Sequence, residues 1–242
     1  MVLNINKPLN WTSFDVVRKV KSLLNIKKVG HAGTLDPLAT GVLIVLTEKD
    51  TKRQSEFLQM PKEYIFEMAL GIVSKTYDME GPLFLKEEFQ RFSDNAISIL
   101  LEKQHVKKAF SNYLGNISQE VPAYSAVKIK GKPLYKYARG KNVAIFPLLP
   151  KKEVEIYGID ILDIIPKKEI LIMGKSHLLP RIKVKVSCSK GTYIRSLAND
   201  VGRDLGVGAV VTELIRTKIG SYAIENSVKI EDMQKSNTTS LL

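Results

Sequence analysis

The chain has 242 residues, of which 37 are Lys or Arg and 25 are Asp or Glu, so its formal net charge is +12. With 44% hydrophobic and 26% charged residues, the composition excludes an intrinsically disordered chain. No apolar run approaches the roughly 18 residues of a membrane-spanning helix, and the start lacks the basic head and apolar run of a secretory signal. One cysteine excludes an internal disulfide, and three histidines leave little for a metal site. We therefore expect a globular cytoplasmic protein without a bound metal.

The positive charge is concentrated in the second half of the chain. Residues 1–121 have a net charge of +2, and residues 122–242 have a net charge of +10. The segment 122–152 contains eight basic residues and no acidic one, and the segment 170–199 contains six basic residues and no acidic one. Basic tracts of this kind favour a polyanion, such as a nucleic acid, as the partner. A solvated surface is the alternative interpretation.

Hydrophobic periodicity and turn residues predict helices and strands without strict alternation. The order favours an α+β fold with a mixed, mainly antiparallel sheet flanked by helices and loops, in one continuous domain. A capping box at Thr12 and Asp15 marks the start of the first helix. In chain order, we expect a strand at Leu3–Asn6, a helix at Ser13–Leu24, a loop without regular structure at Gly30–Gly41, a buried strand at Val42–Leu46, a helix at Thr51–Leu58, a strand at Tyr64–Leu70, helices at Asp94–Glu102 and up to Tyr113, a strand at Val121–Ile129, a helical turn at Leu134–Arg139, strands at Glu153–Ile164, Ile170–Met173 and Arg181–Cys188, a helix at Thr192–Leu205 and a strand at Val210–Ile219.

Asp36 lies in the glycine-rich loop, directly before the predicted buried strand. The glycines let the backbone approach a ligand closely, and Pro37 restricts Asp36 to extended conformations. A carboxylate placed in this way is a candidate catalytic group. The alternative is a turn in which Asp36 caps its own backbone, and the residues alone do not decide between the two. His31 is equally open to a structural role, and we expect Cys188 to be a small buried hydrophobe.

Several segments resemble, in the same order, a known family. The segment Gly30–Leu43, GHAGTLDPLATGVL, resembles the catalytic motif of the bacterial TruB family of tRNA pseudouridine synthases. The resemblance extends over about nine tenths of the chain, because four further motifs follow the family's order: Lys7–Val17, Lys62–Gly81, Gln119–Gly140, and Cys188–Leu197 with Leu205–Arg216.

This resemblance implies the pseudouridine synthase fold and an activity. The family converts the T-arm uridine conventionally numbered 55 in tRNA to pseudouridine, without a metal or an organic cofactor. By resemblance, Asp36 is the nucleophile, Arg195 pairs with it, and Tyr64 stacks on the target base and assists proton removal. Attack by Asp36 at C6 of the base and attack at C1′ of the sugar both remain open.

The resemblance also implies substrate-binding residues. His31 would fill the place in the base stack that the flipped uridine leaves. Tyr193 and Leu214 would line the uracil pocket, and Lys7 would support the Asp36 loop, close to phosphate or to backbone. The remaining candidates are two loop residues and a group of cations expected to hold the phosphates of the T arm: Gly33, Thr34, Lys130, Lys132, Lys136, Arg139 and Lys141.

The resemblance has a limit at the C-terminus, and two other functions remain open. We expect a catalytic domain at 1–225 and a short tail at 226–242, which is too short for the small RNA-binding (PUA-like) domain that usually follows. Asn10 stands where the family commonly has glycine, and asparagine tolerates the left-handed backbone of such a turn. We expect a monomer with no obligate protein partner and no membrane contact. The alternatives are a pseudouridine synthase for another RNA site and a non-catalytic RNA-binding or RNA-folding factor.

Overall fold

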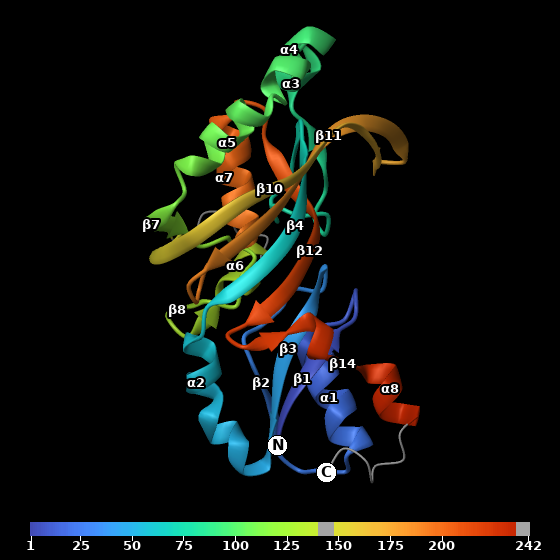
Figure 1. Ribbon diagram of the computed structural model, residues 1–242, viewed down its shortest axis with the longest axis vertical. Coiled ribbons are helices and arrows are strands. Elements are labelled where there is room, and N and C mark those ends of the chain that lie inside the picture. Colours follow the sequence, from blue (N-terminus) through green and yellow to red (C-terminus); the bar gives the residue numbers. More distant parts are fainter. Residues whose placement is uncertain (140–147, 236–242) are drawn as a thin grey trace. The chain divides into compact units, whose positions relative to one another are not determined.

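The computed structural model describes residues 1–139 and 148–235, and the chain forms two compact units (Figure 1). Unit 1 contains residues 1–65, 186–190 and the chain from Glu213 onward. Unit 2 contains residues 66–185 and 191–212. Both units mix helices with strands, and most strand pairs are antiparallel, so the expected α+β class is confirmed.

Unit 1 is built on a sheet with the strand order β14-β1-β3-β12. Strand β3 is buried along almost its whole length, as its continuous apolar sequence predicts. It pairs antiparallel with β1 and β2 and parallel with β12. The elements of unit 1 are β1 (Val2–Lys7), α1 (Ser13–Leu23), β2 (Val29–Ala32), β3 (Ala39–Thr47), a 3₁₀ helix η1 (Glu48–Arg53), α2 (Gln54–Gln59), β13 (Tyr222–Ala223), a second 3₁₀ helix η3 (Ile224–Asn226), β14 (Val228–Lys229) and α8 (Ile230–Lys235), with parts of β4 (Lys62–Leu70), β11 (Lys175–Cys188) and β12 (Ala209–Ile219).

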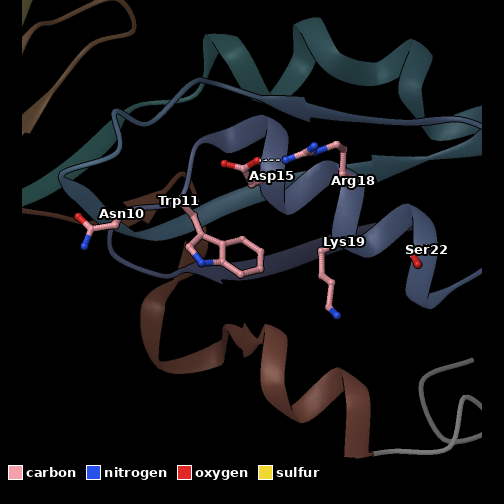
Figure 2. A pocket seen from close by; sticks show the side chains of 6 residues that line it. All are labelled: Asn10, Trp11, Asp15, Arg18, Lys19 and Ser22. Atoms are coloured by element: carbon pink, nitrogen blue, oxygen red, sulfur yellow. Dashed lines mark hydrogen bonds and ion pairs between the residues drawn. The ribbon is translucent and has the colours of Figure 1, made fainter.

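The first helix, α1, begins at the predicted capping box. The backbone N–H of Asp15 donates to Thr12 Oγ1 at 3.1 Å, and the backbone N–H of Thr12 donates to Asp15 Oδ2 at 2.8 Å. The Thr12 hydroxyl also donates to Asp15 Oδ2, at 2.6 Å. This bond, the one from the Thr12 backbone and one from Arg18 lower the pKa of Asp15 to about 2. Figure 2 shows the surface pocket beside this helix start, which is lined by Asn10, Trp11, Asp15, Arg18, Lys19 and Ser22.

Helices α1 and α8 pack together on one side of β1, where they close an apolar core (Figure 1). Val16 and Val20 of α1 are fully buried there. Ile230 and Met233 of α8 belong to the same cluster of buried side chains. Residues 228–233, which the sequence assigns to a short tail, therefore lie in the packed body of unit 1.

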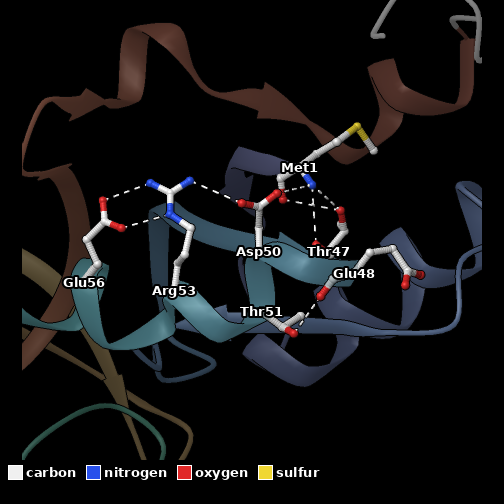
Figure 3. A network of polar contacts seen from close by, with 7 residues as sticks. All are labelled: Met1, Thr47, Glu48, Asp50, Thr51, Arg53 and Glu56. Atoms are coloured by element: carbon white, nitrogen blue, oxygen red, sulfur yellow. Dashed lines mark hydrogen bonds and ion pairs between the residues drawn. The ribbon is translucent and has the colours of Figure 1, made fainter.

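A polar network joins the start of β1 to the segment that follows β3 (Figure 3). The Met1 ammonium donates to Thr47 Oγ1 at 2.7 Å and to Asp50 Oδ2 at 2.9 Å. Arg53 links Asp50 to Glu56, with Nε 2.9 Å from a Glu56 carboxylate oxygen. These groups lie at the surface, where ion pairs add little stability, so the network fixes local geometry rather than the fold.

Unit 2 has strands β10 and β7 paired antiparallel, with two longer helices packed beside them. Helix α5 contacts β10 and α7, and α7 contacts β7. Phe66 and Phe110 meet in its interior with ring centroids 6.5 Å apart. The elements wholly in unit 2 are β5 (Ile72–Val73), β6 (Phe84–Leu85), α3 (Glu87–Gln90), α4 (Asp94–Leu100), α5 (Lys103–Ser111), β7 (Gly115–Glu120), β8 (Lys128–Ile129), β9 (Lys132–Pro133), α6 (Leu134–Ala138), β10 (Lys151–Ile172) and α7 (Ile194–Asp204).

The strands of unit 2 differ from the prediction in two places. The strand expected at Val121–Ile129 is instead β7 at Gly115–Glu120, followed by irregular chain up to the two-residue β8. Pro122 has no N–H to donate to a neighbouring strand. The β7–β10 pairing ends at Glu120, and the next residue, Val121, donates its N–H to the Pro150 carbonyl at 2.9 Å. The two strands expected between 153 and 173 are one strand, β10.

Candidate active site

Asp36 lies in the irregular segment between β2 and β3. The expectation that all of Gly30–Gly41 lacks regular structure was too broad, because Val29–Ala32 pairs with β3 and β3 itself begins at Ala39. Pairing with the buried strand outweighs the weak strand preference of Gly30. The segment 33–38 remains, as predicted, a loop that delivers a half-buried Asp36 at the entrance of β3.

Hydrogen bonds hold this loop on both sides of Asp36. The backbone N–H of Leu35 donates to Ser13 Oγ at 2.8 Å, and Ser13 Oγ donates to the Leu35 carbonyl at 3.1 Å. On the other side, the backbone N–H of Asn10 donates to the Pro37 carbonyl at 2.9 Å. Asn10 has φ 63°, the left-handed conformation expected for it. The neighbours of Asp36 are thus fixed, which aims its carboxylate.

Lys7 reinforces the same turn from the interior. Its side chain is fully buried, and its ammonium donates to the carbonyls of Pro8 at 2.9 Å, Trp11 at 2.5 Å and Pro37 at 3.3 Å. Three carbonyl acceptors stabilise a buried ammonium. Of the two roles expected for Lys7, this burial favours support of the loop through the backbone over contact with phosphate.

Arg216 supports the loop from β12, a role that the sequence motifs did not predict. It is 1% exposed, its Nε donates to the Val42 carbonyl at 2.7 Å, and its Nη2 donates to the Gly33 carbonyl at 3.0 Å. Ser13 was also missed. For Arg216 the sequence did contain a signal, because a charged residue at 216 lies on the same face of an apolar strand as Leu214.

Tyr64 and Leu214 belong to the same unit as Asp36. Leu214 is buried and lies opposite Ala39 in the parallel β3–β12 pair, three residues beyond Asp36. Desolvation raises the pKa of the half-buried Tyr64, and the charge of Asp36 acts in the same direction. Arg216 opposes this rise through its positive charge. Tyr64 is therefore a neutral phenol at pH 7.

Lys62, two residues before Tyr64, closes the C-terminal end of α2. Its ammonium donates to the carbonyls of Leu58 at 2.6 Å and Met60 at 2.5 Å. Burial, more than the nearby charge of Arg216, lowers the pKa of Lys62 to about 8. The lysine of this motif thus fixes the chain that leads into the strand bearing Tyr64.

His31 lies on β2, at the start of the Asp36 loop. Burial lowers the pKa of His31, and the charge of Arg216 lowers it further, so the imidazole is neutral at pH 7. Its Nδ1 is buried without a hydrogen-bond partner among the described residues. Gly33, with φ +95°, and the exposed Thr34 follow it in the loop. A neutral imidazole with an unsatisfied nitrogen is suited to stacking against a base and bonding to it.

The predicted site residues of unit 2 are held by their own set of contacts. Arg195 is buried, and its guanidinium donates to the carbonyls of Thr76 at 2.7 Å and Tyr124 at 3.0 Å, and lies 3.4 Å from Asp78 Oδ2. The Gln119 amide bonds both backbone groups of Tyr193, accepting from its N–H at 2.7 Å and donating to its carbonyl at 3.0 Å. Asp36 and Arg195 belong to different units, so their pairing stays a prediction.

The predicted RNA-holding cations of unit 2 lie on the β8–β9 hairpin and helix α6. Lys130, Lys132, Lys136 and Arg139 are all exposed. The Lys132 ammonium lies 4.5 Å from the centroid of the Tyr137 ring, and the Arg139 guanidinium lies 5.7 Å from that of Tyr135. Lys141, named with this group, lies outside the described residues.

Within residues 1–139 and 148–235, no three His, Cys, Asp or Glu side chains gather as they would around a metal ion. None of the helices in this part of the chain is both long and apolar enough to span a membrane.

Family models match both parts of the chain. Residues 21–194 match the model described as TruB family pseudouridylate synthase, N terminal domain, and residues 195–240 match that of the tRNA pseudouridylate synthase B C-terminal domain. The chain belongs to the TruB family. It is therefore a tRNA pseudouridine synthase, an isomerase, as its motifs predict.

Individual relatives of the TruB family agree with this assignment. The tRNA pseudouridine synthase B of Clostridium tetani is 44% identical over 98% of this chain and 73% of its own length. That of Phocaeicola vulgatus is 41% identical over 95% of this chain and 90% of its own. The solved structure of an H/ACA RNP bound to a substrate RNA containing 2′-deoxyuridine has a similar chain, with 26% identity and a TM-score of 0.63. That match covers 97% of this chain and 52% of the other, so this chain spans about half its length. The expected pseudouridine synthase fold is confirmed.

Proposed function

We propose that this TruB-family chain acts on the T arm of tRNA, converting the uridine conventionally numbered 55 to pseudouridine, with Asp36 as the nucleophile. The observation that supports this most is the Asp36 loop, which side chains and backbone of unit 1 hold on both sides of the carboxylate. A non-catalytic RNA binder has no need for an anionic side chain aimed in this way, since it would repel phosphate.

The reaction exchanges one bond of the nucleoside for another. The C1′–N1 bond breaks, the uracil turns, and a C1′–C5 bond forms; C5 loses its proton and N1 gains one. Asp36 attacks C6 of the base or C1′ of the sugar, and the covalent intermediate divides one hard step into easier ones. Arg195, paired with Asp36 in this proposal, keeps the carboxylate ionised and oriented.

The uridine must leave its stacked position to reach Asp36. In this proposal Tyr64 stacks on the uracil and takes part in removal of the C5 proton, while Tyr193 and Leu214 line the pocket. His31 fills the vacated place in the stack, for which its neutral state is suited because no charge has to be desolvated. Gly33 and Thr34 contact the RNA backbone beside it.

The exposed cations around α6 hold the phosphates of the T arm. Lys132 and Arg139 combine positive charge with neighbouring tyrosine rings, a combination suited to RNA phosphates and bases. The exposed Lys130 adds a further positive charge.

We further propose that the catalytic domain extends through residue 233, because Ile230 and Met233 are buried in the core of unit 1. We also propose that the protein is a monomer that works without an obligate protein partner. The location proposed is the cytoplasm, where bacterial tRNA is made and folded. Light scattering after size-exclusion chromatography, with and without tRNA, tests the oligomeric state.

The substrate is tested with tRNA transcripts labelled with tritium at C5 of uridine. Pseudouridine formation releases one C5 hydrogen for each site, so release of one tritium per tRNA in the presence of a chelator is the expected result. A matched transcript with cytidine at position 55 should release none. Equal release from both transcripts would assign the enzyme to another uridine, and annealing activity without release would favour an RNA-folding factor.

A further inference from the structure

Arg216 is a buried charged side chain whose surroundings connect it to the reaction. A guanidinium remains protonated when buried and needs hydrogen-bond acceptors there. Two of its acceptors are the Gly33 and Val42 carbonyls, at 3.0 and 2.7 Å. Gly33 precedes Asp36 by three residues and Val42 follows it by six. One planar group therefore ties together the two ends of the segment that carries the proposed nucleophile.

Gly41, beside Val42, lets the chain come close to Arg216. Gly41 has φ +96°, and a Cβ placed there would lie 2.3 Å from the Arg216 carbonyl oxygen, which no side chain tolerates. At Gly33 a Cβ would lie 3.5 Å from Arg216 Nη1, an ordinary contact, so the φ of +95° rather than the space favours glycine there. The backbone pairing of Arg216 with Gly41 in the β3–β12 ladder fixes the position of this contact.

Arg216 also acts on Tyr64. Its positive charge lowers the pKa of the Tyr64 phenol, against the rise that burial causes. Arg216 is thus bonded to the chain on both sides of Asp36 and acts electrostatically on the tyrosine.

We propose that Arg216 is a positioning residue for pseudouridine formation: its guanidinium holds the Asp36 loop at Gly33 and Val42, and its charge acts on the hydroxyl of Tyr64. The inference rests on the proposed roles of Asp36 and Tyr64. It predicts that Arg216 affects the chemical step rather than the affinity for RNA, because none of its described contacts faces solvent.

The test compares Arg216→Lys with Lys218→Gln, an exposed control two residues further along the same strand. A lysine keeps the charge but lacks the planar fork that bonds the Gly33 and Val42 carbonyls together. We expect the single-turnover rate of Arg216→Lys to fall about 10²-fold, as misplacement of a catalytic group by about 1 Å does, with the dissociation constant for tRNA unchanged. Lys218→Gln should have the same single-turnover rate and the same dissociation constant for tRNA as the unmodified enzyme. A wild-type rate for a folded Arg216→Lys would overturn the proposal.

A second measurement follows Tyr64 itself and needs no RNA. The tyrosinate absorbance of each protein is titrated and the same curve for its Tyr64→Phe version is subtracted, which isolates Tyr64. In Arg216→Gln the pKa of Tyr64 should rise further, because the opposing charge is gone. An unchanged pKa would remove Arg216 from the role at Tyr64. Because this titration is independent of turnover, it still decides this role if the enzyme proves inactive on tRNA.

Folding is checked by circular dichroism on every variant. If both Arg216→Lys and Arg216→Gln lose the folded state, the positioning role is overturned, since Arg216 would then support unit 1 as a whole. If they fold, the rate effect of Arg216→Lys should be smaller in a Tyr64→Phe background, because part of it acts through the hydroxyl.

Discussion

The Asp36 loop of unit 1 and the cationic segment at 128–139 of unit 2 are built in opposite ways. The loop is held by buried side chains, with Ser13, Lys7 and Arg216 each bonded to its backbone. The segment presents exposed cations over the faces of tyrosine rings, as Lys132 does over Tyr137.

This difference follows from what each region has to do. Covalent chemistry needs one group held within a fraction of an ångström of its target. Attraction to RNA phosphates adds up over many charges and tolerates movement of each one. Substitutions in the loop should therefore change turnover without changing affinity, and substitutions in the segment should do the reverse.

The largest effect expected is that of Asp36→Asn. The amide has nearly the same shape but is not a nucleophile, so turnover should fall by about 10⁴-fold or more. Affinity for tRNA should stay near that of the unmodified enzyme, because the hydrogen bonds that hold the loop at Leu35, Pro37 and Gly33 go to backbone groups. Product analysis after long incubation and a binding titration measure the two. Asp15→Asn is the matched control, an exchange at a cap in the same unit that should leave turnover intact. Full activity of Asp36→Asn would contradict the mechanism.

The second-largest effect expected is that of Arg195→Lys. Turnover should fall about 10²-fold, because a point charge does not reproduce the guanidinium fork. In unit 2 that fork spans the carbonyls of Thr76 and Tyr124 and the Asp78 carboxylate. The matched control is Arg203→Lys on the same helix, where the exposed Arg203 pairs with Asp200. The rate at saturating tRNA, measured alongside the melting temperature, separates a catalytic effect from a stability effect. Equal rates for the two variants would show that the fork is dispensable.

The parts of this site that were predictable from sequence are those set by neighbouring residues. The capping box depends on Thr12 and Asp15, three positions apart, and the left-handed turn depends on Asn10 alone. The irregular chain around Asp36 follows from Gly33 and Pro37. Such signals need no knowledge of the rest of the chain.

The supports of the loop could not be predicted in this way. Ser13 and Leu35 are 22 residues apart, and Arg216 and Gly33 are 183 apart, so only the folded sheet brings them together. The strand at Val29–Ala32 likewise depends on pairing with Thr47 and its neighbours, and the end of β7 before Pro122 depends on where β10 begins. In both strands, pairing with a distant part of the chain outweighs the preference of the local sequence.

Neutralising the cationic segment should have an effect of intermediate size. In contrast to the loop variants, it should lower the affinity for tRNA and leave the rate unchanged. Replacing Lys130, Lys132 and Lys136 together by glutamine should weaken tRNA binding by roughly tenfold and reduce the slope of log affinity against log salt by about 2, since three phosphate contacts are lost. The rate at saturating tRNA should be retained. The control is a triple glutamine variant at Lys19, Lys49 and Lys52 of unit 1. A salt slope equal to that of the unmodified enzyme would move the RNA-binding face elsewhere.

The smallest effect expected is the pH dependence contributed by His31. Its pKa in the folded protein lies below the value of about 6.5 that the unfolded chain has. As the pH falls below about 6.5, His31 becomes protonated in the unfolded state before it does in the folded state, so the free energy of unfolding decreases. We therefore expect the free energy of unfolding in urea to fall more between about pH 7.5 and about pH 5.5 for the unmodified protein than for His31→Phe. His31→Gln, which also cannot titrate, should behave like His31→Phe. Equal losses in all three would mean that the imidazole is charged in the folded loop, which would also remove the reason for its stacking against a base as a neutral ring.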